Sequence, residues 1–342
     1  MGENPLGRVG QWCHAGPMRE ESVTTPGPVP GPVPADGTGP ADGTGPADGT
    51  GPAGGAGAAD GAAAAPAGTV RRPDGRTLRL HSRGTGSTLV LFEAGLGAGG
   101  ASWGAVLDAL PAGVLGLAYD RAGHGGSDPA PGPRDLGSLV EDLLAVVDAV
   151  PHERLVLVGH SWGGPIVREA AARLRATGDP VTGAVLVDPA EELADLYFTR
   201  AAQSMTVLQG ALLPVLARMS LLAPLQRATH RSLPAPWREE AAAAVSSPSA
   251  ARAVRAESRH VTPGLRGLRL DPPAPLGAAV SVLSGRRPEG LGRRMRDELT
   301  AAHRARAERE DGRFVAASRS GHVIAASEPE LVVEEIRRLT GE

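Results

Sequence analysis

Short apolar runs alternate with longer stretches of helical periodicity from Thr69 to the end of the chain. Continuous apolar runs are typical of parallel strands that are covered on both faces. Flanking glycine, proline and aspartate residues set the limits of each run. The runs predict strands at 77–80, 88–92, 114–119, 155–158, 184–187, 279–283 and 313–316.

The segments between these strands carry apolar residues at helical spacing. In residues 135–150 the spacing is set by Leu136, Leu139, Val140, Leu143, Leu144 and Val147. Further helices are predicted at 165–176, where Pro165 suits a first turn, and at 293–310 and 329–339. Strand and helix alternation of this kind predicts an α/β fold, with a mostly parallel sheet and helices on both faces.

The alternation lapses between residues 190 and 270, which are rich in Ala, Leu and Arg and predict helices with repeated proline breaks. We interpret this segment as an inserted helical cap over the carboxyl ends of the strands, where ligands bind in open α/β sheets. Residues 69–189 and 271–342 then form the two parts of the core. Six apolar cap residues recur at helical spacing, and we expect them to pack onto the core, with the lining of an acyl pocket as the alternative. They are Leu208, Leu212, Leu213, Leu216, Met219 and Leu222.

Residues 1–68 lack the apolar side chains of a core. Residues 24–68 consist almost wholly of Gly, Pro, Ala, Thr and Asp, and Ala-Asp-Gly-Thr-Gly-Pro repeats from Ala35, Ala41 and Ala47. Such a segment cannot offset the entropy of ordering its backbone. We therefore predict a disordered tail, in a chain whose translation starts at Met1 or at Met18.

Composition narrows the function classes. The net charge is −3, all 35 basic residues are arginines, and no long block of one sign occurs, so we expect no binding to nucleic acid or to an anionic membrane. Cys13 is the only cysteine, so no disulfide within the chain is expected. The start lacks a signal-peptide pattern, and Pro214, Arg218 and Pro224 interrupt the most apolar stretch. We expect a cytoplasmic protein without a membrane span.

The strongest chemical signal is Gly159-His160-Ser161-Trp162-Gly163. It follows the apolar run 155–158 and precedes a predicted helix, which is the context of a nucleophile elbow. Glycines suit the first and last positions because side chains there would collide with neighbouring backbone. We therefore assign Ser161 as a nucleophile, against the alternative of a glycine-rich turn with an incidental serine.

Three further motifs accompany the elbow, in order. Residues 92–97 are Phe-Glu-Ala-Gly-Leu-Gly, residues 119–127 are Tyr-Asp-Arg-Ala-Gly-His-Gly-Gly-Ser, and residues 320–322 are Ser-Gly-His before Pro-Glu-Leu-Val. Together with the elbow they resemble the α/β-hydrolase superfamily, in particular its small bacterial esterase-like and lactonase-like serine hydrolases. The resemblance implies an α/β-hydrolase fold with an inserted helical cap, and covers nearly all of the chain outside the tail and the cap.

The resemblance also implies catalytic roles. His322 is the expected base for Ser161, and the expected oxyanion hole consists of the backbone N–H groups of Leu96 and Trp162. The chain departs from the usual His-Gly start of the oxyanion loop, which leaves the orientation of that loop open. Asp188 follows the predicted strand 184–187, which precedes the cap, and some relatives carry the triad acid at the end of that strand. We therefore assign the triad acid to Asp188. Glu289, Asp297 or no acid at all are the alternatives.

Other polar residues near these motifs have weaker claims. His160 is expected to pack or form hydrogen bonds, and His124 to shape the site. Asp120 and Arg121 are expected to form an ion-pair and turn element beside the site. No histidine pair has metal-ligand spacing, so neither a metal nor another cofactor is expected.

The leading hypothesis is hydrolysis of a carboxylic ester, lactone or similar small acyl substrate through an acyl-enzyme. Alternatives are a proline-iminopeptidase-like amidase, a C–C hydrolase and a cofactor-free perhydrolase. A member of the fold that binds a small ligand without catalysis is an alternative of another class. Dehalogenases and epoxide hydrolases carry Asp at the nucleophile position, so Ser161 argues against both. The substrate and the oligomeric state remain open.

Overall fold

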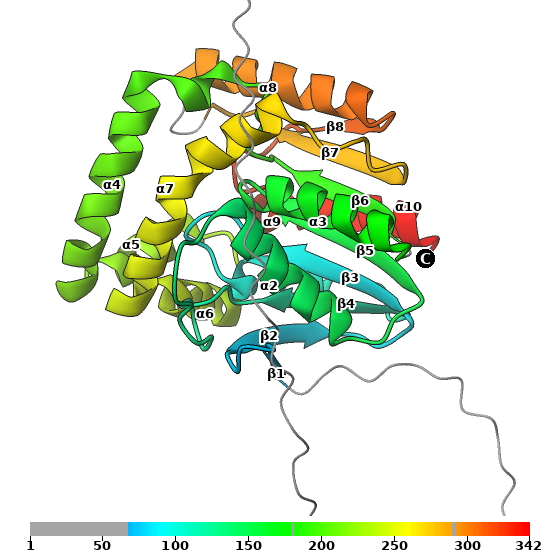
Figure 1. The fold of residues 1–342 in the computed structure, drawn as a ribbon, viewed down its shortest axis with the longest axis horizontal. Coiled ribbons are helices and arrows are strands. Elements are labelled where there is room, and N and C mark those ends of the chain that lie inside the picture. Colours follow the sequence, from blue (N-terminus) through cyan, green and yellow to red (C-terminus); the bar gives the residue numbers. More distant parts are fainter. Residues whose placement is uncertain (1–67, 180, 289–291) are drawn as a thin grey trace, which may run out of the picture. The chain divides into compact units, whose positions relative to one another are not determined.

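A computed structural model describes residues 68–179, 181–288 and 292–342, so the predicted tail lies outside the described residues except for Gly68. An eight-stranded sheet with the order β1-β2-β4-β3-β5-β6-β7-β8 organises these residues (Figure 1). The strands β3 to β8 are parallel to one another, and β1 and β2 pair in antiparallel fashion at one edge. The strands are β1 (Thr69–Arg71), β2 (Thr77–Arg83), β3 (Thr88–Glu93), β4 (Val114–Tyr119), β5 (Arg154–His160), β6 (Val181–Val187), β7 (Ala279–Gly285) and β8 (Arg313–Ala317).

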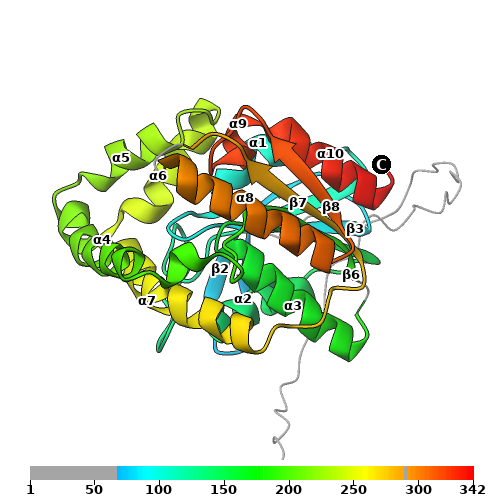
Figure 2. The same ribbon diagram turned by 90° about the horizontal axis from the view of Figure 1, so that it is seen from above.

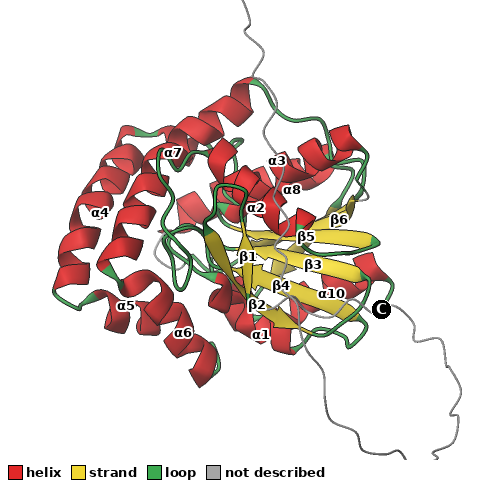
Figure 3. Ribbon diagram, turned by 60° about the horizontal axis from the view of Figure 1, so that its bottom comes forward, coloured by secondary structure: helices red, strands yellow, loops and turns green. Residues whose placement is uncertain are grey.

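Helices cover both faces of the sheet because successive strand side chains point to opposite sides. In β3, Leu89 and Leu91 belong to one core cluster, and Val90 and Phe92 belong to the other. Figure 3 shows α2, α3 and α8 on one side of the strands and α1 and α10 on the other. The covering helices are α2 (Leu136–Asp148), α3 (Gly163–Thr177) and α8 (Gly292–Arg309), and α1 (Gly104–Asp108), α9 (Ile324–Ser327) and α10 (Pro329–Thr340).

The predicted fold class is confirmed, and the apolar runs locate seven of the eight strands to within a few residues of their ends. Strand β1 was not predicted, because it has three residues and only Val70 among them is buried. The 3-10 helix Gly100–Trp103 and α1 were also not predicted. Both lie in a Gly/Ala-rich segment without a helical apolar period.

Four longer helices lie between β6 and β7 in chain order, preceded by the 3-10 helix Asp195–Phe198. Figure 2 shows them together at the end of the sheet opposite the C-terminus. The C-terminal helix lies at the amino ends of the strands, where Arg154 at the start of β5 donates to the carbonyl of Thr340. The four helices therefore lie at the carboxyl ends, and we propose that they form the cap predicted for residues 190–270. They are α4 (Arg200–Arg218), α5 (Leu222–Thr229), α6 (Ala235–Ser246) and α7 (Pro248–Leu270).

The prediction of proline breaks is wrong at two positions. Pro214 lies inside α4 and Pro263 lies inside α7, and both helices continue past the proline. Proline removes one backbone donor, but packing between neighbouring helices contributes more to helix stability than local propensity does. The two helices lie side by side along much of their length (Figure 1), which accounts for their continuity.

The packing prediction for the cap is wrong for half of its residues. Leu222 is buried, and Leu213 and Leu216 pack around it. The other three are exposed, because α4 turns Gly210 and Ala217 inward and the opposite face outward. The exposed residues are Leu208, Leu212 and Met219.

Within the described ranges, no single helix has the length and apolar composition needed to cross a bilayer. Helices α4 and α5 meet those criteria only when taken as a pair, and they are bent by 115° relative to each other.

Candidate active site

Ser161 occupies the turn between β5 and α3. Its φ of 53° is unusual for a residue other than glycine, and such strained conformations cluster at functional sites. A Cβ at Gly159 would lie 2.4 Å from the carbonyl oxygen of Gly163, and a Cβ at Gly163 would lie 2.4 Å from the carbonyl oxygen of Glu93. The prediction that the elbow needs both glycines is confirmed.

His322 lies in the loop between β8 and α9 and reaches Ser161. Its Nε2 atom lies 3.0 Å from Oγ of Ser161, and its Nδ1 atom lies 2.7 Å from Oδ2 of Asp188. The structure thus brings together the three side chains that the sequence assigned to a triad. Hydrogen-bonded contacts in this order are what a serine nucleophile, its base and an orienting acid require.

Asp188 directly follows β6 and, like Ser161, has a positive φ, of 42°. Its Oδ1 accepts the backbone N–H of Gly285 at 2.9 Å and the Nη1 of Arg296 at 2.7 Å, while Oδ2 also accepts Nη2 of Arg296 at 3.1 Å. Burial raises the pKa of Asp188. The hydrogen bond from His322, the electrostatic attraction of that ring and the Arg296 hydrogen bonds outweigh it, and the pKa lies well below its ordinary value. The carboxylate is therefore ionised.

Of the two alternative acids, only Asp297 lies in the described residues, and it does not contact His322 there. Asp297 is exposed on α8, one residue after the buried Arg296. Glu289 lies outside the described residues. Among described carboxylates, Asp188 is the one that contacts His322.

Arg296 and His303 were not identified from the sequence, although both surround Asp188. Arg296 is almost fully buried, and His303 is bonded to Ser284 Oγ at 2.9 Å and to the carbonyl of Pro189 at 2.8 Å. Burial lowers the pKa of His303, so its ring is neutral beside the carboxylate. Both residues come from α8, whose Arg/Glu-rich sequence is typical of a solvent-exposed helix, so no local signal distinguishes them.

The predicted oxyanion donors flank Ser161. Leu96 lies in the loop after β3 and lines the same cavity as Ser161, and Trp162 follows the nucleophile directly at the start of α3. No carbonyl or side-chain oxygen in the described part of the chain accepts a hydrogen bond from either backbone N–H. Two free amide donors beside a nucleophile suit a developing oxyanion.

Arg121 holds the loop that carries Leu96. Its guanidinium donates to the carbonyls of Ala94 at 2.6 Å and Gly95 at 2.7 Å. It also pairs with Glu93 at 2.7 Å and with Glu257 of α7 at 2.9 Å. Because all three charged groups are fully buried, this network fixes the loop and connects it to the cap helix.

Asp120 forms its contacts separately from Arg121. It accepts the backbone N–H of Gly100 at 2.9 Å and faces His81 at 3.3 Å. The expected element beside the site is therefore two elements: a turn held by Asp120, and an ion pair of Arg121 with glutamates that the sequence did not assign.

A cavity of about 290 Å³ opens above Ser161 and is lined by the loop after β3, the histidine loop and α5. His160 lines it and bonds to the backbone carbonyl of His322 at 2.9 Å through Nε2. Burial and the charge of His322 lower the pKa of His160 to about 3, so its ring is neutral. His230, which directly follows α5, also lines the cavity, and burial lowers its pKa. His124 is fully buried close to Glu257 and away from this cavity.

Metal-ligand geometry does not occur in residues 68–179, 181–288 and 292–342: no three His, Cys, Asp or Glu side chains there are placed to hold an ion.

Comparison with known proteins gives one family match. The sequence profile described as "Alpha/beta hydrolase family" matches residues 89–335. A protein named as the carbamate hydrolase RutD, from Azorhizobium caulinodans, is 36% identical over 92 residues, which are 27% of this chain and 34% of that protein. A protein named as the bifunctional esterase/perhydrolase DCH, from Acinetobacter calcoaceticus, is 35% identical over 100 residues, which are 29% of this chain and 36% of that protein.

The chain matches about a third of the length of these curated relatives. Among solved structures, the esterase EaEST from Exiguobacterium antarcticum aligns with a TM-score of 0.57 and 16% identity, over 80% of this chain and 99% of that one. This likeness concerns the fold.

Proposed function

Because the chain belongs to the alpha/beta hydrolase family, we propose that it is a serine hydrolase that cleaves a carboxylic ester, lactone or similar acyl bond through an acyl-enzyme. The observation that carries the proposal is the continuous hydrogen-bonded order from Ser161 through His322 to Asp188. The names of the relatives, an esterase and a carbamate hydrolase, support the same class of acyl bond.

In this mechanism Ser161 Oγ attacks the acyl carbon while His322 Nε2 accepts the hydroxyl proton. The carbonyl oxygen becomes an oxyanion, which accepts hydrogen bonds from the free backbone N–H groups of Leu96 and Trp162. The bond to the leaving oxygen or nitrogen then breaks, and His322 donates its proton to the leaving group. A water molecule, deprotonated by His322, then attacks the acyl carbon of the acyl-enzyme. The bond to Ser161 Oγ breaks, His322 returns its proton to that oxygen, and the acid leaves.

Asp188 supports this cycle through His322. Its ionised carboxylate accepts from Nδ1, which leaves Nε2 free to act as the base and stabilises the imidazolium that forms. Arg296 and the N–H of Gly285 hold the carboxylate in place from its other side. The acid is thus oriented by three donors rather than by the histidine alone.

A panel of p-nitrophenyl esters with graded acyl chains, lactones and aryl carbamates tests the proposal. We expect hydrolysis of at least one class, and a loss of kcat of about 10⁴-fold or more in Ser161→Ala. Ser102→Ala is the matched control, because this serine lines the same cavity but bonds to the carbonyl of Gly99 at 2.7 Å. Equal activity of Ser161→Ala and the wild type would overturn the proposal.

A further inference from the structure

The outer face of α4 is apolar, although it points away from the rest of the described residues. Five apolar side chains follow one another at intervals of three and four positions, so they form a single stripe. Each is between 47% and 62% exposed. The opposite face of α4 buries Gly210 and Ala217. The stripe, which we call the α4 stripe, consists of Met205, Leu208, Leu212, Val215 and Met219.

The segment that contains the α4 stripe is rich in arginine and lacks acidic residues, although Arg227 pairs with Glu239 at 2.7 Å. No acidic residue occurs between Asp195 and Glu239, whereas this segment contains five arginines. Helix α7 adds further arginines at spacings that place them along one side. Those of the segment are Arg200, Arg218, Arg227, Arg231 and Arg238, and those of α7 are Arg252, Arg255, Arg259 and Arg266.

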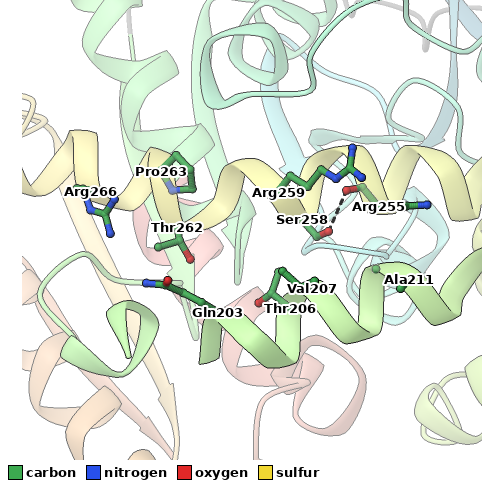
Figure 4. Close-up of a pocket in the computed structure, with 11 residues that line it drawn as sticks. Gln203, Thr206, Val207, Ala211, Arg255, Ser258, Arg259, Thr262, Pro263 and Arg266 are labelled. Carbon is green, nitrogen blue, oxygen red and sulfur yellow. Dashed lines mark hydrogen bonds between the residues drawn. The ribbon is translucent and has the colours of Figure 1, made fainter. Parts of the chain in front are cut away.

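A groove of about 320 Å³ lies between α4 and α7, on the side of α4 that carries Gly210, and no residue of the α4 stripe lines it. Figure 4 shows Val207 and Ala211 of α4 on one side of the groove and Arg255 and Arg259 of α7 on the other. Neither arginine forms an ion pair with a carboxylate among the described residues. The hydroxyl of Ser258 adds a hydrogen-bonding group to the groove.

We propose that the α4 stripe docks on an anionic phospholipid membrane. The stripe would enter the boundary between headgroups and acyl chains, and Arg200 and Arg218, which are exposed at the two ends of α4, would contact lipid phosphates. The lack of acidic residues from Asp195 to Glu239 supports a lipid over a second copy of the chain. Two copies meeting at this surface would bring arginine against arginine without carboxylates to pair with them.

This proposal revises the expectation drawn from the net charge. A total of −3 over 342 residues predicts no attraction to anionic membranes. The total, however, averages over a chain in which residues 196–238 hold five arginines and no acidic residue. Docking at the inner face of a membrane agrees with the predicted cytoplasmic location.

The helix that follows the α4 stripe reaches the active-site cavity. Leu225 of α5 follows the α4 stripe in the sequence and is 55% exposed. It also lines the cavity above Ser161. Docking would therefore bring the mouth of the cavity close to the lipid. This consequence rests on the proposed function, whereas docking itself is measured by binding and is independent of catalysis.

Flotation of the full-length protein with vesicles tests the proposal. We expect binding to phosphatidylglycerol vesicles that is at least tenfold tighter than binding to phosphatidylcholine vesicles, and that weakens as salt rises. Leu208→Glu with Leu212→Glu should weaken binding to phosphatidylglycerol at least tenfold. The matched control is Leu270→Glu with Met295→Glu, which adds the same charge at exposed apolar positions outside the stripe and should keep most of the binding.

A second pair of substitutions tests the arginines. Arg200→Gln with Arg218→Gln should weaken binding to phosphatidylglycerol vesicles by about 25-fold, at about fivefold for each charge. All variants should hydrolyse a short soluble ester at the wild-type rate, which shows that they fold. If no ester is hydrolysed, unchanged circular dichroism and thermal unfolding replace this control.

Three outcomes would overturn the proposal. One is a failure of the wild type to float with phosphatidylglycerol vesicles. Another is wild-type binding by the Leu208→Glu, Leu212→Glu variant. The third is a dimer in light scattering that this variant converts to a monomer without vesicles present, which would assign the α4 stripe to a second copy of the chain.

Discussion

Asp188→Asn is expected to destabilise the protein as well as inactivate it, because the acid has a second partner. Asp188 receives two hydrogen bonds from Arg296, whose side chain is almost fully buried. Asparagine is neutral, so the guanidinium charge would stay buried without a counter-charge. Breaking a buried ion pair from one side costs about 3–5 kcal/mol. That is a large share of the 5–15 kcal/mol, roughly, by which domains are stable.

A second substitution separates the two effects. In Asp188→Asn with Arg296→Met the buried charge is gone, and a flexible apolar side chain of similar length fills its place. We expect the double variant to be more stable than either single variant. Its activity should stay about 10⁴-fold below that of the wild type, because His322 still lacks the carboxylate that orients it.

Urea unfolding followed by tryptophan fluorescence, together with kcat on a short soluble ester, measures both effects. A loss of 3–5 kcal/mol corresponds to a midpoint lower by about 1 M or more, given an m-value of roughly 3 kcal/mol/M for a domain of this size. An Asp188→Asn variant that unfolds at the wild-type urea concentration, or a double variant less stable than both single variants, would show that Arg296 does not depend on Asp188 as its counter-charge. Recovery of activity in the double variant would refute the role of the acid.

Three further predictions follow from the buried groups around the site. Gly159→Ala should lower stability by about 2 kcal/mol or more and activity at least tenfold, because the added Cβ would lie 2.4 Å from a backbone oxygen. The control is Gly267→Ala in α7, where no atom lies within 4 Å of the added Cβ. It should be neutral or stabilising in the same unfolding assay. Arg121→Met should lower kcat more than it changes KM, and it should destabilise the fold by about 3–5 kcal/mol. Kinetics and urea unfolding measure the two effects. A wild-type kcat would show that the loop carrying Leu96 does not depend on Arg121. The third prediction concerns pH. Burial lowers the pKa values of four histidines, that of His160 from 6.5 to about 3; they are His124, His160, His230 and His303. Below pH 6.5 the unfolded chain therefore binds protons that the native protein does not. Stability should therefore fall between pH 7.5 and pH 5, by up to about 1.4 kcal/mol for each pH unit and each histidine, and equal urea midpoints at the two pH values would contradict the assignment of neutral rings.

The strands and the nucleophile elbow could be predicted because their signals are local. An apolar run such as 155–158 needs only its own residues to indicate a buried strand, and the glycines around Ser161 follow from the tightness of one turn. The order of motifs then brought Asp188 and His322 into consideration, and the structure brings both to Ser161.

Buried charges and the orientation of the cap could not be predicted in this way. Arg296 and Glu257 are charged residues on helices whose composition suggests exposure, and only the packed structure shows that each meets an opposite charge. The periodicity of α4 indicates an apolar stripe without showing which face is covered. Leu208 was therefore expected inside and lies outside.

Labelling with a fluorophosphonate probe, followed by mass spectrometry of the digested protein, tests the central claim most directly. Such a probe reacts with a serine only when a neighbouring base activates it. We predict one labelled peptide, modified at Ser161, in the wild type and no label in Ser161→Ala, while Ser102→Ala is labelled as the wild type is. Undiminished labelling of Ser161→Ala, or a wild type that the probe does not modify at Ser161, would contradict the assignment of Ser161 as the nucleophile.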